Sequence, residues 1–230
     1  MENTKQHRGG KLFTCLFTLS FILMGLFAIN PVSARPATVK MATIEIPLSA
    51  FEGIYQNKVN TFAYFKVTAV NNTLVAKQIE GNQQFVLTRK SELAFEMKDG
   101  DGDETIPVAF FKNDAGEIAQ VVVAGNDTWN KVKEYVPVKE VKLSADQLKA
   151  FAGKYEFKEK PGTFLQITPT PTGLTLKQLW DDREINFIAI SDVGFLNKEM
   201  AFPLKFTKDK DGNAIKVLAF NRDSWDKVKE

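Results

Sequence analysis

The chain repeats its own sequence with an offset of about one hundred residues, and this repeat constrains the fold more than any other feature. The segment Leu48–Tyr55 (LSAFEGIY) returns as Leu148–Tyr155 (LKAFAGKY). The segment Trp129–Glu134 (WNKVKE) returns as Trp225–Glu230 (WDKVKE). A repeat that opens and closes with matching segments indicates a structural unit of about ninety residues that occurs twice. Positions shared by both copies are expected to build the fold, and positions that differ are better candidates for function.

Residues 1–34 have the features of a secretory signal peptide. A basic start precedes an apolar run over residues 12–29, and the segment Val32–Ala34 offers the small residues that a signal peptidase recognises. The run approaches the roughly 20 residues that span a bilayer, so an uncleaved anchor is the alternative. We expect cleavage after Ala34, a periplasmic or secreted protein, and no membrane attachment after cleavage.

The leader contains the only histidine, His7, and the only cysteine, Cys15. Its removal takes the net charge from +2 to zero, because three basic residues and one acidic residue are lost with it. A neutral protein has no field that would favour nucleic acid as a partner. An exported chain without cysteine must be stabilised by its hydrophobic cores, since it has no disulfides.

The mature chain therefore lacks the residues of several common active sites. Without histidine and cysteine it cannot form a Ser-His-Asp triad, a Cys-His pair, the usual zinc site, or haem and iron–sulfur ligation through those residues. Ser224 and Lys227 match the Ser-x-x-Lys spacing of penicillin-binding enzymes, but that chemistry needs both residues on a helix. We expect a strand there, on which the two side chains point to opposite faces. The sequence predicts no enzymatic activity and no cofactor.

One acidic segment resembles the start of a calcium-binding loop. Asp99, Asp101 and Asp103 alternate, but Glu104 stands where the loop needs glycine and Phe110 where it needs a bidentate glutamate. An acidic hairpin turn is the preferred interpretation. Weak calcium binding by the three aspartates is the alternative, and no other metal site is expected.

Both copies are expected to consist of short strands separated by turns and preceded by a short helix. Eight strands fit between residues 53 and 134, and eight more between residues 153 and 229. This spacing is typical of an antiparallel barrel or a tight sandwich. We expect an all-β chain of two tandem antiparallel barrels, with the signal peptide over residues 1–34, the first barrel over residues 35–138 and the second over residues 139–230.

Apolar positions that both copies retain predict the barrel interior. Phe65 and Val67 correspond to Leu165 and Ile167, and each pair alternates along one strand. Aromatic side chains inside would leave little room, because an eight-stranded barrel is only wide enough for packed side chains or one small ligand.

The first residues of each copy resemble those of a known class of barrel. A short helix followed by Gly-x-Tyr, as in Gly53–Tyr55 and Gly153–Tyr155, is similar to the opening of lipocalin-like barrels. With the Leu-x-Ala-Phe start, an Asp-x-x-Gly hairpin turn and a basic closing strand, it resembles a small bacterial barrel family often appended to β-lactamase-like serine hydrolases, esterases and D-aminopeptidases. The resemblance covers residues 44–134 and 141–230. It implies two lipocalin-like accessory modules without catalytic residues.

Recurrence separates residues of the fold from candidates for binding. The residues assigned to the fold recur in both copies: Gly53, Tyr55, Gly153, Tyr155, Trp129 and Trp225. Trp180 has no counterpart, because Glu80 takes its place in the first copy, so contact with a ligand or another barrel is expected of it. Tyr64 and Phe62 lie on the strand face opposite Phe65 and are expected to cover a neighbouring domain or a partner.

These observations predict an exported, non-enzymatic binding or interaction module made of two lipocalin-like barrels. One alternative is a carrier of a small apolar ligand, held inside or between the barrels. Another is a regulatory partner of a separately encoded serine hydrolase, which only the family resemblance suggests. A cavity would favour the carrier, and a filled interior with an exposed aromatic patch would favour the interaction module.

Overall fold

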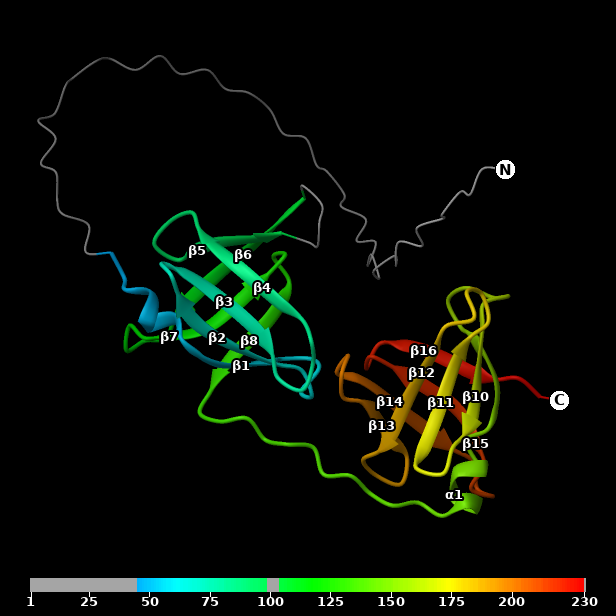
Figure 1. Cartoon of the computed structure of the whole chain (residues 1–230). Helices are drawn as coiled ribbons and strands as arrows, with labels where there is room; N and C mark the ends of the chain where they lie inside the picture. The colour runs from blue at the N-terminus through cyan, green and yellow to red at the C-terminus, as the bar shows by residue number, and fades with distance from the viewer. Residues whose placement is uncertain (1–44, 99–103, 230) are drawn as a thin grey trace, which may run out of the picture. The chain divides into compact units, whose positions relative to one another are not determined.

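The computed structural model describes residues 45–98 and 104–229 and contains two closed barrels, each of eight antiparallel strands (Figure 1). In each barrel every strand pairs with its neighbours in sequence, and the first strand pairs with the last. The prediction of an all-β chain with two tandem antiparallel barrels is confirmed. In the described ranges no helix is long and apolar enough to cross a membrane. The expected leader lies outside these ranges.

The first barrel follows a single turn of 3-10 helix, η1 (Leu48–Phe51). Its strands are β1 (Gly53–Asn57), β2 (Tyr64–Val70), β3 (Thr73–Gln78), β4 (Gln84–Arg89), β5 (Ala94–Lys98), β6 (Thr105–Lys112), β7 (Ile118–Val123) and β8 (Asp127–Val132).

The second barrel follows helix α1 (Ala145–Lys149), where Ser144 and Gln147 form the expected capping box. Its strands are β9 (Gly153–Phe157), β10 (Phe164–Pro169), β11 (Gly173–Gln178), β12 (Glu184–Ala189), β13 (Gly194–Asn197), β14 (Phe202–Lys208), β15 (Ala214–Ala219) and β16 (Asp223–Lys227).

An aromatic cluster closes the helix end of each barrel. The ring of Phe51 in η1 lies 5.1 Å from that of Phe95 and 4.9 Å from that of Phe110 in edge-to-face contacts. Phe151 repeats this arrangement, with its ring 5.0 Å from Phe195 and 4.7 Å from Phe206. Contacts of this kind add stability beyond the burial of apolar area. The shared phenylalanines therefore plug one end of both barrels.

Each barrel has a core of its own. The buried apolar side chains form two separate clusters, one drawn from the first copy and one from the second. Phe65 and Val67 line the interior of the first barrel, and Leu165 and Ile167 are buried in the second, as the alternation predicts. The end opposite the helix is formed in the first barrel by the β1–β2, β3–β4 and β7–β8 connections, and in the second barrel by the β9–β10, β11–β12, β13–β14 and β15–β16 connections. We call it the distal end.

Candidate ligand-binding site

The recurring tyrosines anchor the short helices. Tyr55 donates a hydrogen bond from its hydroxyl to the carbonyl oxygen of Phe51 over 2.7 Å, and Tyr155 does the same to Phe151 over 2.8 Å. Burial raises the pKa of both phenols. This is the folding role that recurrence predicts, since each hydroxyl satisfies a carbonyl at a helix end.

The recurring glycines make room for a lysine of the last strand. Gly53 and Gly153 have φ angles of 150° and 141°, which side chains rarely adopt. A Cβ atom on Gly53 would lie 2.5 Å from Cε of Lys131, and one on Gly153 would lie 2.6 Å from Cε of Lys227. Lys131 then donates to the carbonyl oxygen of Ala50 over 3.2 Å. The glycines, tyrosines and lysines thus belong to the helix end of each barrel.

The first barrel contains a cavity of about 220 Å³ that opens toward the distal end. Its floor includes Tyr55 and Phe110, whose rings pack against the helix-end cluster. Two polar side chains, Gln83 and Asp127, lie at its rim. The apolar walls are formed by Phe65, Val67, Ala76, Phe85, Leu87, Met97, Val108, Val121, Val123 and Trp129.

Small residues in the first copy leave this space. Ala76 on β3 corresponds to Leu176 on β11, which is buried in the core of the second barrel. Two further positions at the distal end differ in the same direction: Asn57 replaces Phe157, and Ala124 replaces Phe220. The first barrel therefore lacks three large side chains that the second barrel has.

The exposure of the wall residues agrees with an open distal end. Phe65 and Phe85 are half-buried in the first barrel, whereas Leu165 and Ile185 at the corresponding positions are buried. Val123 is likewise half-buried, whereas its counterpart Ala219 is buried.

Stacked aromatic rings fill the same end of the second barrel. Trp225 lies between Phe157, at a ring distance of 4.7 Å and 28° between planes, and Trp180, at 6.1 Å and 13°. Phe220 stacks on Phe202 at 3.7 Å. Phe202 and Trp225 belong to the buried core of the second barrel, and Phe157 and Phe220 pack against that core.

A carboxylate held in a fixed position lies at the rim of the cavity. Asp127 accepts hydrogen bonds from Nδ2 of Asn57 over 2.6 Å and from Nε1 of Trp129 over 2.8 Å. Asn57 is itself fixed, because its Oδ1 accepts from the backbone amides of Val59 and Asn60. The network differs in the second barrel, where Phe157 replaces Asn57 and Nε1 of Trp225 has no acceptor among the described residues.

The three aromatic residues singled out from the sequence lie outside this cavity. Trp180 is 50% exposed and covers Trp225, so its place in the fold is the distal end of the second barrel. Tyr64 is only 5% exposed, because Tyr135 packs on its ring at 5.0 Å and Gln56 donates to its hydroxyl. Phe62 is half-buried in the β1–β2 connection, outside the strand that we expected to include it. Tyr64 is therefore covered by Tyr135, and the expectation that it also covers a neighbouring domain or a partner stays a prediction.

The sequence placed Phe65 and Val67 inside the barrel but did not indicate a cavity, because the candidate Trp180 is a residue that the second copy has in addition. Trp180 is an added aromatic residue of the second copy, whereas Ala76, which lines the cavity, is smaller than its counterpart Leu176. The comparison of the two copies could have found this difference.

The remaining candidates from the sequence do not form a site among the described residues. Asp99, Asp101 and Asp103 lie outside the described ranges. Within those ranges no group of three His, Cys, Asp or Glu side chains could hold a metal ion. Ser224 lies on strand β16 with Lys227, as expected for a segment that is not helical.

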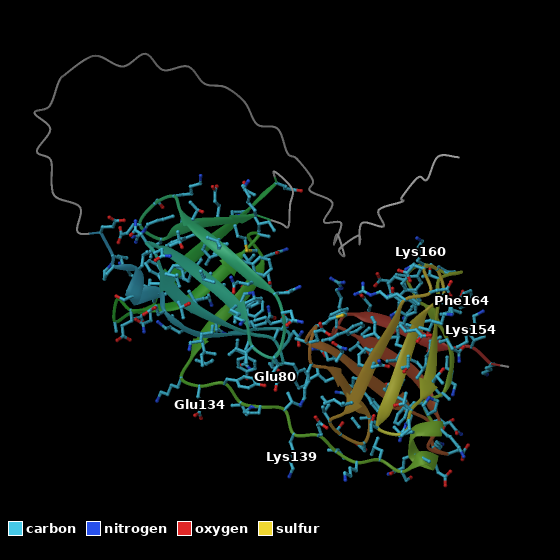
Figure 2. The ribbon with its side chains drawn as sticks, viewed as in Figure 1. Glu80, Glu134, Lys139, Lys154, Lys160 and Phe164 are labelled. Carbon is cyan, nitrogen blue, oxygen red and sulfur yellow. The ribbon has the colours of Figure 1, made fainter. Side chains whose placement is uncertain are left out.

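A close contact between a cation and an aromatic ring lies on the outside of the second barrel. Nζ of Lys154 on β9 lies 3.8 Å from the centroid of the Phe164 ring on the neighbouring strand β10, and both side chains are labelled in Figure 2. Such a contact stabilises neighbouring strands. It accounts for an aromatic residue outside the core.

The chain matches no model of a known protein family, and no curated protein is significantly similar to it.

Proposed function

We propose that this protein binds one small, largely apolar molecule in its first barrel. The observation that carries the proposal is the cavity of about 220 Å³ at a place where the second barrel is filled by its own side chains. Cavities of about 150 Å³ with apolar walls stay dry and bind benzene, so this one has room for about six to ten non-hydrogen atoms. Of the functions considered, the carrier of a small ligand is the one that such a cavity favours.

The second barrel supports this proposal as an internal reference. Both barrels share the helix-end cluster, the Gly-x-Tyr motif and the tryptophan of the last strand. They differ at the distal end, where the first copy has Ala76, Asn57 and Ala124 and the second copy has Leu176, Phe157 and Phe220. An empty apolar space costs stability. Retaining it in one barrel is consistent with a binding role.

Nuclear magnetic resonance of the tryptophan indole N–H groups tests the proposal. The chain has three tryptophans, and only Trp129 lines the cavity. Addition of toluene should shift the resonance of Trp129 and leave those of Trp180 and Trp225 in place. A shift of all three, or of none, would contradict binding in the first barrel.

A variant that imports a residue of the second copy provides the control. Ala76→Leu should remove toluene binding and raise the free energy of unfolding by about 1 kcal/mol, as filling a cavity does. Ala69→Leu, on an exposed position of β2, should leave toluene binding unchanged. Loss of binding together with a higher stability separates a filled cavity from a damaged barrel.

We also infer that the protein acts outside the cytoplasm and without catalysis. Support comes from the leader motif that ends at Ala34 and from a mature sequence without histidine and cysteine. N-terminal sequencing of protein exported by its host should then find Arg35 first. An N-terminus at Met1 would contradict export by cleavage.

An interaction module remains the second candidate, and the exposed half of Trp180 favours it. A partner, including a separately encoded serine hydrolase, would contact this ring at the distal end of the second barrel. Trp180→Glu, which copies the first barrel, should then weaken capture of that partner and leave toluene binding unchanged.

A further inference from the structure

Among the described residues, Asp127 is the only charged side chain that lines the cavity. Gln83 is the other polar side chain at the rim, and the hydroxyl of Tyr55 at the floor is already engaged with Phe51. Within the part of the chain that the structure describes, a ligand that enters this barrel therefore meets apolar walls and, at the rim, the carboxylate of Asp127.

The carboxylate is positioned before any ligand arrives. It accepts one hydrogen bond from Asn57 and one from Trp129, on different oxygens. A carboxylate has about four lone-pair directions, so both oxygens can accept further hydrogen bonds. Holding an acceptor in place in advance lowers the entropy that binding would otherwise cost.

The carboxylate at the position of Asp127 has different neighbours in the two barrels. In the second barrel the corresponding Asp223 is paired with its neighbour Arg222, whose Nε lies 2.7 Å from Oδ1 and whose second guanidinium nitrogen lies 3.3 Å from Oδ2. In the first barrel Asn126 takes the place of Arg222. Among the described residues, no lysine or arginine lies within 4.0 Å of the Asp127 carboxylate. The filled barrel neutralises its carboxylate, and the hollow barrel leaves it available.

We propose that the ligand of the first barrel is a small amphiphile with an apolar body and a positively charged head that donates hydrogen bonds, such as a primary ammonium group. Its body occupies the cavity, and its head lies at the rim against Asp127, where water can still reach the ammonium group. Anionic amphiphiles of the same size are disfavoured, because their head would face a carboxylate. This inference rests on the proposed function and adds the class of ligand.

Three six-carbon probes that differ only in their head test the inference on the full chain: hexylammonium, hexanol and hexanoate. The reporter is the indole N–H of Trp129, because it donates directly to Asp127. Hexylammonium should bind about tenfold more tightly than hexanol, as expected for one charged hydrogen bond at a partly exposed site. Hexanoate should bind more weakly than hexanol.

Two substitutions test the role of the carboxylate. Asn126→Arg copies the second barrel and should remove the preference for hexylammonium while toluene still binds, because Asn126 does not line the cavity. Asp127→Asn should remove the same preference by another route. Ala115→Arg adds an equal charge in the exposed β6–β7 turn at the helix end and should leave the preference intact.

The outcomes separate the inference from the function on which it rests. Equal affinities for the three probes, or a preference that survives both Asn126→Arg and Asp127→Asn, would overturn the ligand class while toluene binding still supports the cavity. If neither toluene nor any of the three probes shifts the Trp129 resonance, the proposed function fails and the inference fails with it.

Discussion

Tyr55 and Tyr155 show how a single hydroxyl ties a helix to a barrel. Each phenol is almost fully buried, and each donates to a carbonyl four residues earlier in the chain. A buried carbonyl that loses its donor costs free energy, because no water replaces the lost hydrogen bond. The hydroxyl and the ring therefore make separate contributions that two substitutions can distinguish.

Tyr155→Phe should lower the free energy of unfolding of the second barrel by about 1–2 kcal/mol, since it removes only the hydrogen bond to Phe151. Tyr155→Ala should cost about 3–5 kcal/mol, because the ring is lost as well. Urea denaturation followed by circular dichroism measures both, and Tyr55→Phe is the matched variant in the first barrel. Equal losses for the Phe and Ala variants of Tyr155 would show that the ring contributes nothing.

At this scale the sequence predicted roles well where both copies agree. The Gly-x-Tyr residues and the inward Phe65 and Val67 lie where recurrence and alternation placed them. For Tyr64 the strand period gives the direction of the side chain, but its cover, Tyr135, comes from a segment beyond the last strand. Alternation along a strand gives the face of a residue and says nothing of what packs on that face.

The elements of the two barrels match strand by strand, but the connections at the distal end differ in what they carry. The β7–β8 turn contains Ala124 and the β15–β16 turn contains Phe220, and both residues have a φ angle of 52°. The two turns thus share a backbone conformation in which either side chain is accommodated. What changes is the ring that Phe220 lays on Phe202.

Phe220→Ala should therefore leave the turn intact and lower the free energy of unfolding of the second barrel by about 2 kcal/mol, less than for a fully buried phenylalanine because Phe220 is half-buried. Thermal unfolding of the full chain measures the loss. Phe111→Ala, at a side chain that is 47% exposed on β6, is the control and should cost well below 1 kcal/mol. A similar loss in both variants would contradict the view that the stacked rings close the second barrel.

The number, order and pairing of the elements could be predicted because a repeat of about ninety residues with eight short strands allows few closed arrangements. The cavity could not be predicted in the same way. Its walls come from seven strands, and whether Ala76 leaves a space depends on which side chains meet it across the barrel. Periodicity assigns Ala76 to the interior, but packing alone shows that its neighbours do not fill the space.

On the scale of the whole molecule, the proposed function assigns ligand binding to the first barrel and the greater stability to the second. They share a backbone plan and have separate cores, so each can be altered without repacking the other. The filled second barrel should be the more stable, since cavities reduce stability in proportion to their volume. Under the proposed function, the first barrel has a lower stability because it keeps a space for the ligand.

Residues 35–138 and residues 139–230, expressed separately, should each fold, because every strand of each barrel finds both partners within its own half. The second half should have the higher melting temperature. The difference should be several degrees for each kcal/mol by which the cavity lowers the free energy of unfolding of the first half. Toluene should raise the melting temperature of the first half and leave that of the second half unchanged, since a ligand stabilises only the state that binds it. Circular dichroism of the two halves with and without toluene measures all three expectations. A first half that is unfolded on its own, or a second half that responds to toluene equally, would show that stability and binding are not divided between the barrels in this way.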